Sequence, residues 1–351
     1  MMSTGERSTT LMLATTKSST TTAEPESTTT ITTTTTTTEE ADLSGNSPWS
    51  ITGTALVSSL TRLSCTRLFI DSDDTLYGAD NDRHYIWKLS KNAKYATIVA
   101  GVYESTGSDS VKLQYPEDVY VDRYGSIYVL DSNNHRVQKF INGTIHGQTI
   151  AGLAEPGGCS LNRLYYPRGL AFDPTDTFMY IADRSCHRII RFLTNSTLGT
   201  NGVVVAGTGS QADTNKALSG PWGIWYSSSK HNDLLIGNYD GHSVIRWTPG
   251  ATSGTFVAGL PGIACSNSTC FSRPADVKND ADLNMYVVDT ENHRVQMFCK
   301  NSDVGVTIVG NGVAGASSTQ LDSPRGMAFD SEMNMYVCDT GNKRVQKFLK
   351  L

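Results

Sequence analysis

The sequence has no long apolar run and no large excess of charge of one sign. No stretch of its 351 residues approaches the 18 or more consecutive apolar residues of a transmembrane helix, and the apolar island at 11–14 is too short for the core of a signal peptide. Of the net charge of −5, residues 1–46 account for −4, with six acidic and two basic side chains. We therefore expect no transmembrane segment, and no nucleic-acid partner, because such partners favour a basic surface.

Known catalytic motifs are missing as well. The sequence contains no glycine-rich phosphate loop, no nucleophile elbow and no zinc-protease helix. This favours a binding protein over an enzyme, and we expect no catalytic residue, no metal ion and no cofactor.

The first 46 residues differ in composition from the rest of the chain. They contain 18 Thr and 6 Ser, with seven consecutive Thr at 32–38. Such a segment has too little apolar surface to offset the entropy lost on ordering, so we predict a disordered tail with the composition of an O-glycosylated stalk. Residues 47–351 are then predicted to form the folded domain.

One segment of this domain recurs six times with small changes. The copy IYVLDSNNHRVQKF ends at Phe140, and its acidic position recurs at spacings of 51, 52, 55, 51 and 50 residues. That position is occupied in the six copies by Asp80, Asp131, Asp183, Asn238, Asp289 and Asp339. A period this regular is typical of a propeller or a solenoid.

Each unit is predicted to contain four short strands separated by turn residues. In the third copy these are PRGLAFD at 167–173, MYIAD at 179–183, HRIIRF at 187–192 and VVVAG at 203–207. The sixth unit ends without its fourth strand, and WSITG at 49–53 matches the missing pattern. We therefore predict an all-β, six-bladed β-propeller in which 49–53 completes the last blade and hides its edge.

The repeated segments resemble NHL repeats, whose core reads roughly Tyr-Val-x-Asp-x-x-Asn-His/Arg-Arg-Val. The resemblance covers nearly all of 49–351 and implies a six-bladed propeller, in agreement with the number of copies. A Thr tract joined to NHL units also resembles surface proteins of small invertebrates.

Two polar positions of the repeat are interpreted as structural. Asp131 and Arg136 recur as a pair five residues apart, and the fourth unit replaces both, with Asn238 and Ser243. Their joint loss indicates that the two side chains meet, since a buried carboxylate without its partner is costly. A column of imidazoles, followed by Lys343 in the sixth unit, is interpreted as turn and packing residues rather than metal ligands: His84, His135, His187, His242 and His293.

One NHL-like family, the peptidyl-hydroxyglycine amidating lyases, uses histidines at the propeller centre to hold zinc, beside the proline that opens a blade. The matching stretches here contain no His, so the resemblance does not carry lyase activity. It does carry Asp118 and Asp276, which match a calcium-binding Asp of the lyases and lie in opposite blades. A cation in the central channel and simple strand-end capping are both open interpretations.

Cysteines and sequons favour an extracellular setting. Cys159 can pair with Cys186, and Cys265 with Cys270; Cys65 and Cys338 lie near the seam of the ring, and Cys299 is left over. N-glycosylation sequons begin at Asn142, Asn195 and Asn267. The alternatives are reduced cysteines and a cytoplasmic protein.

Long variable loops at 102–115, 153–166, 208–220, 260–273 and 311–323 are predicted to share one face, the usual layout of a recognition surface. The predicted binding residues at its centre are Arg67, Glu117, Arg168, Trp222 and Arg325, with Asp118 and Asp276 below them. This mixed set fits a protein, peptide or glycan partner.

Three functions follow as hypotheses. The first is a monomeric, non-enzymatic recognition propeller at the cell surface or secreted. The second is an intracellular partner-binding module resembling those of ubiquitin-ligase and RNA-regulating NHL proteins, although no RING or B-box spacing is present. The third is a metal-dependent lyase or lactonase.

Overall fold

The computed structural model describes residues 47–56, 63–153, 155–227 and 232–351. The chain divides into two units, 1–41 and 42–351, and all the described residues belong to the second. The predicted disordered tail, 1–46, lies outside the described residues. None of the helices in the described part is long and apolar enough to span a membrane.

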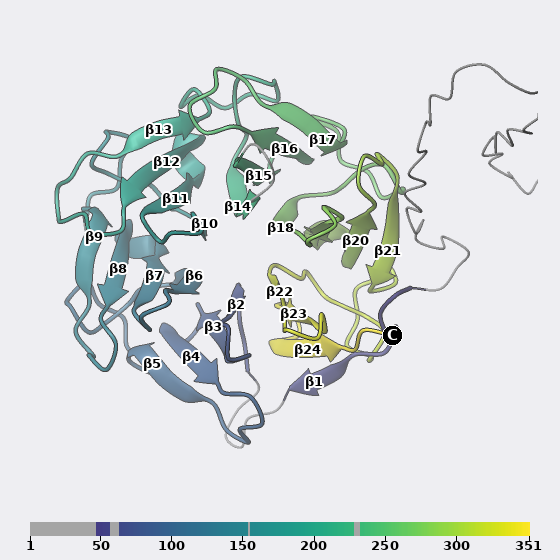
Figure 1. The fold of residues 1–351 in the computed structure, drawn as a ribbon, viewed down its shortest axis with the longest axis horizontal. Helices are drawn as coiled ribbons and strands as arrows, with labels where there is room; N and C mark the ends of the chain where they lie inside the picture. Colours follow the sequence, from purple (N-terminus) through teal and green to yellow (C-terminus); the bar gives the residue numbers. More distant parts are fainter. Residues whose placement is uncertain (1–46, 57–62, 154, 228–231) are drawn as a thin grey trace, which may run out of the picture. The chain divides into compact units, whose positions relative to one another are not determined.

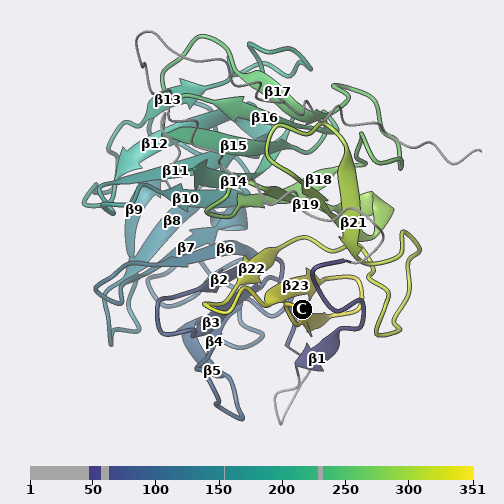
Figure 2. The same cartoon turned by 45° about the vertical axis from the view of Figure 1, so that its right-hand side comes forward.

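The described residues form a ring of six four-stranded antiparallel sheets around a central axis (Figure 1), which confirms the six-bladed β-propeller. Figure 2 shows the same sheets side by side in a view turned by 45° from that of Figure 1. In blades one to five, strands consecutive in the sequence pair with each other and the innermost strand comes first; in blade six the outermost strand is β1.

The first three blades have the following strands. Blade one contains β2 (Leu68–Ile70), β3 (Leu76–Asp80), β4 (Tyr85–Leu89) and β5 (Thr97–Gly101). Blade two contains β6 (Pro116–Val121), β7 (Ile127–Asp131), β8 (Arg136–Phe140) and β9 (Gln148–Gly152). Blade three contains β10 (Gly169–Phe172), β11 (Phe178–Asp183), β12 (Arg188–Leu193) and β13 (Val203–Ala206).

The other three blades complete the ring. Blade four contains β14 (Pro221–Ser227), β15 (Asp233–Asn238), β16 (Ser243–Trp247) and β17 (Thr255–Gly259). Blade five contains β18 (Pro274–Asn279), β19 (Met285–Asp289), β20 (Arg294–Phe298) and β21 (Gly305–Val309). Blade six contains β22 (Met327–Phe329), β23 (Met335–Asp339), β24 (Arg344–Phe348) and β1 (Thr54–Leu56). Short 3-10 turns follow β7, β11 and β19: η1 (Ser132–Asn134), η2 (Arg184–Cys186) and η3 (Thr290–Asn292).

The strand that completes blade six is β1, which pairs antiparallel with β24, Thr54 opposite Lys347 and Leu56 opposite Val345. The predicted segment, 49–53, was therefore placed five residues too early. Two glycines bracket the fourth strand of a typical blade, and Gly53 corresponds to the first of them. Its N–H donates to the Ser318 carbonyl, as the N–H of Gly147 donates to that of Ser110.

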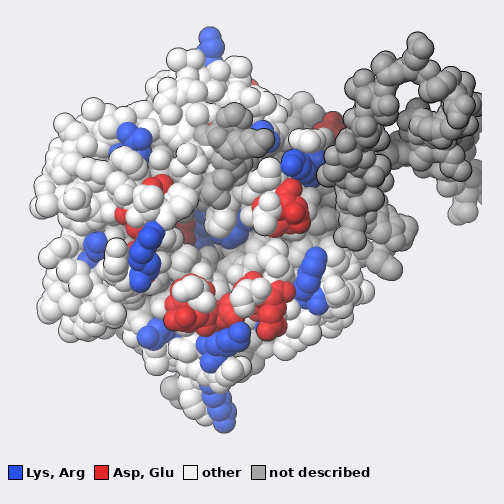
Figure 3. Space-filling model, in the orientation of Figure 1, with Lys and Arg blue, Asp and Glu red and all other residues white. Residues whose placement is uncertain are grey.

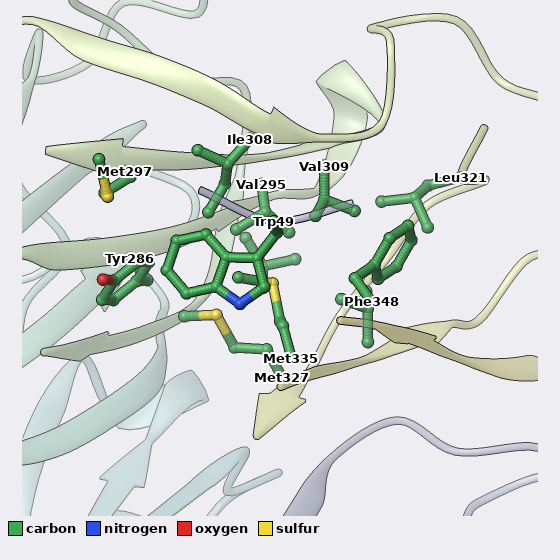
Figure 4. Close-up of a cluster of buried hydrophobic side chains, with 12 residues drawn as sticks. Trp49, Tyr286, Val295, Met297, Ile308, Val309, Leu321, Met327, Met335 and Phe348 are labelled. Carbon is green, nitrogen blue, oxygen red and sulfur yellow. The ribbon is translucent and has the colours of Figure 1, made fainter. Parts of the chain in front are cut away.

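Trp49 also helps to close the ring, through side-chain packing between blades five and six. Its side chain is fully buried between blades five and six (Figure 4), edge-on to Tyr286 with ring centroids 5.4 Å apart. The indole N–H donates to the Met333 carbonyl at 2.8 Å, so burial leaves no polar group unpaired. The N-terminal segment thus closes the ring both by strand pairing and by a large apolar anchor.

Candidate functional site

The repeated Asp and Arg side chains hold each blade to the loop that enters it. In blade two the Asp131 carboxylate accepts hydrogen bonds from Arg136 Nε at 2.8 Å and from the Gln114 N–H at 2.7 Å. The Arg136 guanidinium also donates to the Ser108 and Asp109 carbonyls of the loop. Equivalent ion pairs occur in blades three, five and six, which confirms that the paired side chains meet: Asp183 with Arg188, Asp289 with Arg294 and Asp339 with Arg344.

The histidine column joins each blade to the next. All five histidines have a positive φ, between 48° and 67°, at the turn before the third strand. In each, Nδ1 accepts a hydrogen bond from a backbone N–H of the following blade, as His135 does from Tyr166 at 3.3 Å and His293 from Ser323 at 3.1 Å. At the sixth position Lys343 instead pairs with Asp82 of blade one at 3.0 Å. These residues are therefore turn and packing residues, as predicted.

Arg67 lies at the centre of the ring, between two carboxylates from opposite blades. Its guanidinium is 2.7 Å from Asp276 Oδ1 and 3.4 Å from Asp118 Oδ2, and the side chain is 3% exposed. Each Asp also accepts a backbone N–H from a neighbouring blade, Asp118 from Leu170 and Asp276 from Met327. Burial raises the pKa of Asp118, and the attraction of Arg67 opposes that rise.

This arrangement corrects the expected place of Arg67. It lies in the layer of Asp118 and Asp276 rather than on the binding face, because it occupies the same strand position as they do. At that position the other blades have glycine, and a Cβ on Gly169 would come within 3.3 Å of the Arg67 guanidinium. The side chain thus lies against Gly169, and its guanidinium contacts both carboxylates that were considered as ligands of a channel cation.

The residues one position earlier form the upper layer, where the first strands leave the joining loops. Arg168 forms an ion pair with Glu117, and its guanidinium lies 4.7 Å from the ring centre of Trp222. The Arg325 guanidinium lies 5.4 Å from the centre of the same indole. Blade five contributes only Ala275 here, and its small side chain packs beneath Trp222. The structure therefore brings four of the predicted binding residues together.

Two further residues join this group from the turns between second and third strands. Tyr239 packs against Trp222 in a tilted arrangement with ring centroids 4.4 Å apart, and the Arg184 guanidinium lies 5.4 Å from the same indole. Arg184 also pairs with Asp240 at 2.9 Å. Sequence reasoning missed both, although each has a large side chain directly after the repeated acidic position, where other blades have Asn, Ser or Thr. We call the six residues the mouth cluster: Glu117, Arg168, Arg184, Trp222, Tyr239 and Arg325.

The mouth cluster contains polar atoms without partners. Five of its buried side-chain atoms have no hydrogen-bond partner among the described residues: Glu117 Oε2, Arg168 Nε, Arg184 Nε, Trp222 Nε1 and Arg325 Nε. Leaving a buried polar group unpaired costs about 1–3 kcal/mol, so a ligand that pairs with several of them gains correspondingly. Four of the five atoms are N–H donors, which favours a ligand rich in acceptor oxygens.

Charges of both signs are interspersed on the face of the ring shown in Figure 3, and Lys and Arg atoms are visible in the hollow at its centre. One basic side chain near the axis is Lys278, whose ammonium lies 4.6 Å from the ring centre of Trp225. Burial lowers the pKa of Lys278, although Asp276 opposes the shift. The centre of the ring is thus lined by ionised groups rather than by a purely apolar surface.

The cysteines and sequons occupy the expected loops. Disulfides join Cys159 to Cys186 and Cys265 to Cys270, as predicted, and a third joins Cys65 to Cys338 across the seam between blades six and one. Cys299 is free. The three predicted glycosylation residues, Asn142, Asn195 and Asn267, are exposed, and Asn267 lies inside the small Cys265–Cys270 loop.

Comparison with known proteins supports the fold. The NHL repeat family model matches residues 113–140, which include the first three strands of blade two. The chain is therefore a six-bladed β-propeller with an NHL repeat. No curated protein sequence matches the chain.

Solved structures with this architecture differ widely in what they do. An auxiliary nutrient binding protein from Bacteroides ovatus has a TM-score of 0.60 at 15% identity, over 86% of this chain and 72% of the other. A gluconolactonase from Xanthomonas campestris has a TM-score of 0.57 at 12% identity, over 85% and 94%. The virginiamycin B lyase from Staphylococcus aureus has a TM-score of 0.51 at 15% identity, over 81% and 80%. At these identities the similarity establishes the fold alone.

Proposed function

We propose that this protein is a non-enzymatic recognition propeller that binds a protein, peptide or glycan through its loop-rich face, at the mouth cluster. The observation that carries the proposal is the set of five unpartnered buried polar atoms around Trp222. A buried aromatic anchor flanked by arginines has the composition of a binding hot spot. A rigid ring supports it, so binding does not require the site to be ordered first.

Arg325 is the residue of the mouth cluster that favours acidic or oxygen-rich ligands. Its side chain forms no hydrogen bond or ion pair with any described residue, whereas Arg168 is paired with Glu117 and Arg184 with Asp240. A half-buried guanidinium that lies over an indole without an ion pair retains its capacity for a bidentate bond with an acidic or oxygen-rich group. Acidic peptides and acidic or hydroxyl-rich glycans therefore fit best.

The metal-dependent lyase or lactonase is the competing function. Against it, the stretches that open the blades lack the histidines of the amidating lyases, and the guanidinium of Arg67 contacts both Asp118 and Asp276 at the centre. Metal analysis of the purified protein tests this directly. A stoichiometric tightly bound metal that is lost in a D118N/D276N variant would favour the enzyme.

We propose a cell-surface or secreted location, because the three disulfides require an oxidising compartment and the three sequon asparagines are exposed. The alternative is a cytoplasmic protein. Treating the natural protein with an N-glycosidase distinguishes the two locations, since a mass loss that disappears in an N142Q/N195Q/N267Q variant requires passage through the secretory route.

The binding proposal is tested by screening the full chain against arrays of glycans and of acidic and neutral peptides. Trp222→Ala and Arg325→Gln should each weaken the binding found by about tenfold or more. The matched control is Tyr124→Ala, which removes an exposed aromatic ring on the opposite face. Binding that Tyr124→Ala weakens and the two mouth variants leave intact would overturn the site, provided that their melting temperatures are unchanged.

A further inference from the structure

A second concave site lies away from the mouth cluster, between blades four and five. It is a pocket of about 460 Å³, within the size range of small-molecule sites. Its apolar wall includes Leu235, Met285 and Phe298, and its polar wall includes Arg246 and Asn279. Its lining also includes Leu283, between the first and second strands of blade five, and residues 299–303, between the third and fourth.

In other blades, side chains of the repeat fill the equivalent space. Five blades have Tyr three residues before the repeated acidic position. In four of them its hydroxyl donates to an acidic residue after the first strand: Tyr77 to Asp71, Tyr128 to Asp122, Tyr286 to Asp280 and Tyr336 to Asp330. A lysine from the third strand covers this pair in blades two and six. Lys347, for example, lies 5.0 Å from the Tyr336 ring centre and 3.3 Å from Asp330.

Blade four keeps a basic residue at the lysine position, but it has neither the tyrosine nor the acidic residue that the lysine contacts in blades two and six. Leu235 stands where the other blades have Tyr, and Ser227 stands where they have Asp. Arg246 occupies the lysine position, directly across the strand pair from Leu235. Its side chain is exposed to the pocket and forms no ion pair or hydrogen bond within the described ranges 47–56, 63–153, 155–227 and 232–351.

Blade five also departs from the repeat where it packs against blade four. The last residue of the first strand packs against the tyrosine of the preceding blade, as Phe172 does on Tyr128 at 4.9 Å and Phe329 on Tyr286 at 4.9 Å. In blade five this residue is Asn279, whose Oδ1 is buried without a hydrogen-bond partner. Three departures from the repeat therefore line one pocket, from both sides of one blade interface.

We propose that this pocket binds a small hydroxylated aromatic carboxylate. Its ring takes the volume of the absent tyrosine between Leu235 and Phe298, and its carboxylate replaces the absent Asp as the partner of Arg246. A hydroxyl on the ligand donates to Asn279 Oδ1, which accepts a hydrogen bond and cannot donate one. The guanidinium favours a planar carboxylate because it offers two parallel N–H donors.

Other charges near the pocket do not replace this pairing. Asp233 is buried and already accepts the Thr248 hydroxyl at 2.6 Å. Lys300 and Asp303 are exposed at the rim and opposite in sign. Lys300, like Arg246, forms no ion pair with a described residue, but Arg246 is the one that faces Leu235 across the strand pair, at the cation position of the repeat.

Cys299 provides a direct readout, because the free thiol also lines the pocket. The test measures the rate of Cys299 alkylation in the full chain with 4-hydroxybenzoate, with its neutral amide, and with cyclohexanecarboxylate. We expect saturable protection by 4-hydroxybenzoate and much weaker protection by the other two. Protection by the amide equal to that by the acid would overturn the assignment of a carboxylate.

Two variants separate the site from general effects. S227D/L235Y rebuilds the pair that other blades carry, so it should fold, keep its melting temperature and lose protection. Arg246→Met, which copies Met297 of blade five, should weaken protection about tenfold or more. The control is Lys139→Met in blade two, which removes the equivalent cation where the space is filled. Trp222→Ala, which lies in the mouth cluster, should leave the protection of Cys299 unchanged. If both S227D/L235Y and Arg246→Met keep the wild-type protection by 4-hydroxybenzoate, the proposal is wrong.

Discussion

At the scale of single residues, the recurring side chains support the fold and the exceptions bear on function. The Asp and Arg pairs hold loops to blades, and the histidines hold blade to blade. Arg67 is an exception of a different kind, because it occurs once and neutralises two acids from other blades. It is the residue on which the electrostatic balance at the centre of the ring depends.

Replacing Arg67 by Met should destabilise the protein by about 3–5 kcal/mol, since it leaves two buried carboxylates without their cation. Chemical denaturation at pH 7 measures the loss. The variant R67M/D118N/D276N should recover much of the stability because the repulsion is removed. A fully stable R67M protein would show that Arg67 is not needed to balance the two carboxylates, and that Lys278 or solvent does so instead.

The histidines predict a loss of stability in mild acid. Burial lowers the pKa of His84, His135, His187 and His242 below their ordinary value of 6.5. A lowered pKa means that the folded state resists protonation, so stability is complete above pH 6.5 and falls as the pH drops through the folded values. Protonation also places an N–H on Nδ1, opposite the backbone donor.

This loss is measured by comparing unfolding free energies at pH 7.5 and 5.0. Burial raises the pKa of Asp183 to about 6, an effect of opposite sign, so the wild type alone is not decisive. Replacing the four histidines by Asn, which tolerates positive φ, should reduce the difference between the two pH values. An undiminished difference would assign the acid sensitivity to other groups.

At the scale of elements, blade six depends on parts of the chain far apart in sequence. β1 supplies its outer strand, and Trp49 fills the space between blades five and six. The sequence predicted such a closure, but by 49–53 rather than 54–56. Gly53, which precedes the fourth strand, was taken for the glycine that ends it. Trp49 was assigned to the fourth strand. It forms only an isolated antiparallel bridge with Lys350, and its larger contribution is a side chain packed into a core.

Trp49→Ala should lower stability by about 3–5 kcal/mol, the usual cost of truncating a buried tryptophan. Trp49→Phe keeps much of the packing and loses the hydrogen bond to Met333, so it should cost less. Thermal unfolding ranks the three proteins. A melt of Trp49→Ala equal to that of the wild type would mean that β1 closes the ring without the anchor.

At the scale of the whole molecule, the period of about 50 residues predicted the architecture because each repeat forms one blade. The position of Trp222, Arg168 and Arg325 followed from their place at the start of first strands. Arg67 was assigned to the wrong layer because blade one lacks the proline that marks this register in the other blades, where Cys65 stands. The pocket was not foreseen, since it arises from side chains absent in two blades that meet only in three dimensions.

Intact mass measurement tests the covalent framework. Reduction should increase the mass by about six units, two hydrogens for each of the three bridges. Before reduction a single alkylation should occur, at Cys299. Two or more alkylations of the native protein would show that one of the bridges is open.

The bridge between Cys65 and Cys338 spans 273 residues and ties the last blade to the first. Together with the peptide chain it makes the propeller a covalent circle. A single proteolytic cut at any point between these two residues therefore leaves one connected molecule, with the cut ends held in place by the flanking blades. Joining loops on the binding face can be nicked without releasing a fragment, and new chain ends can be placed there to make circularly permuted propellers.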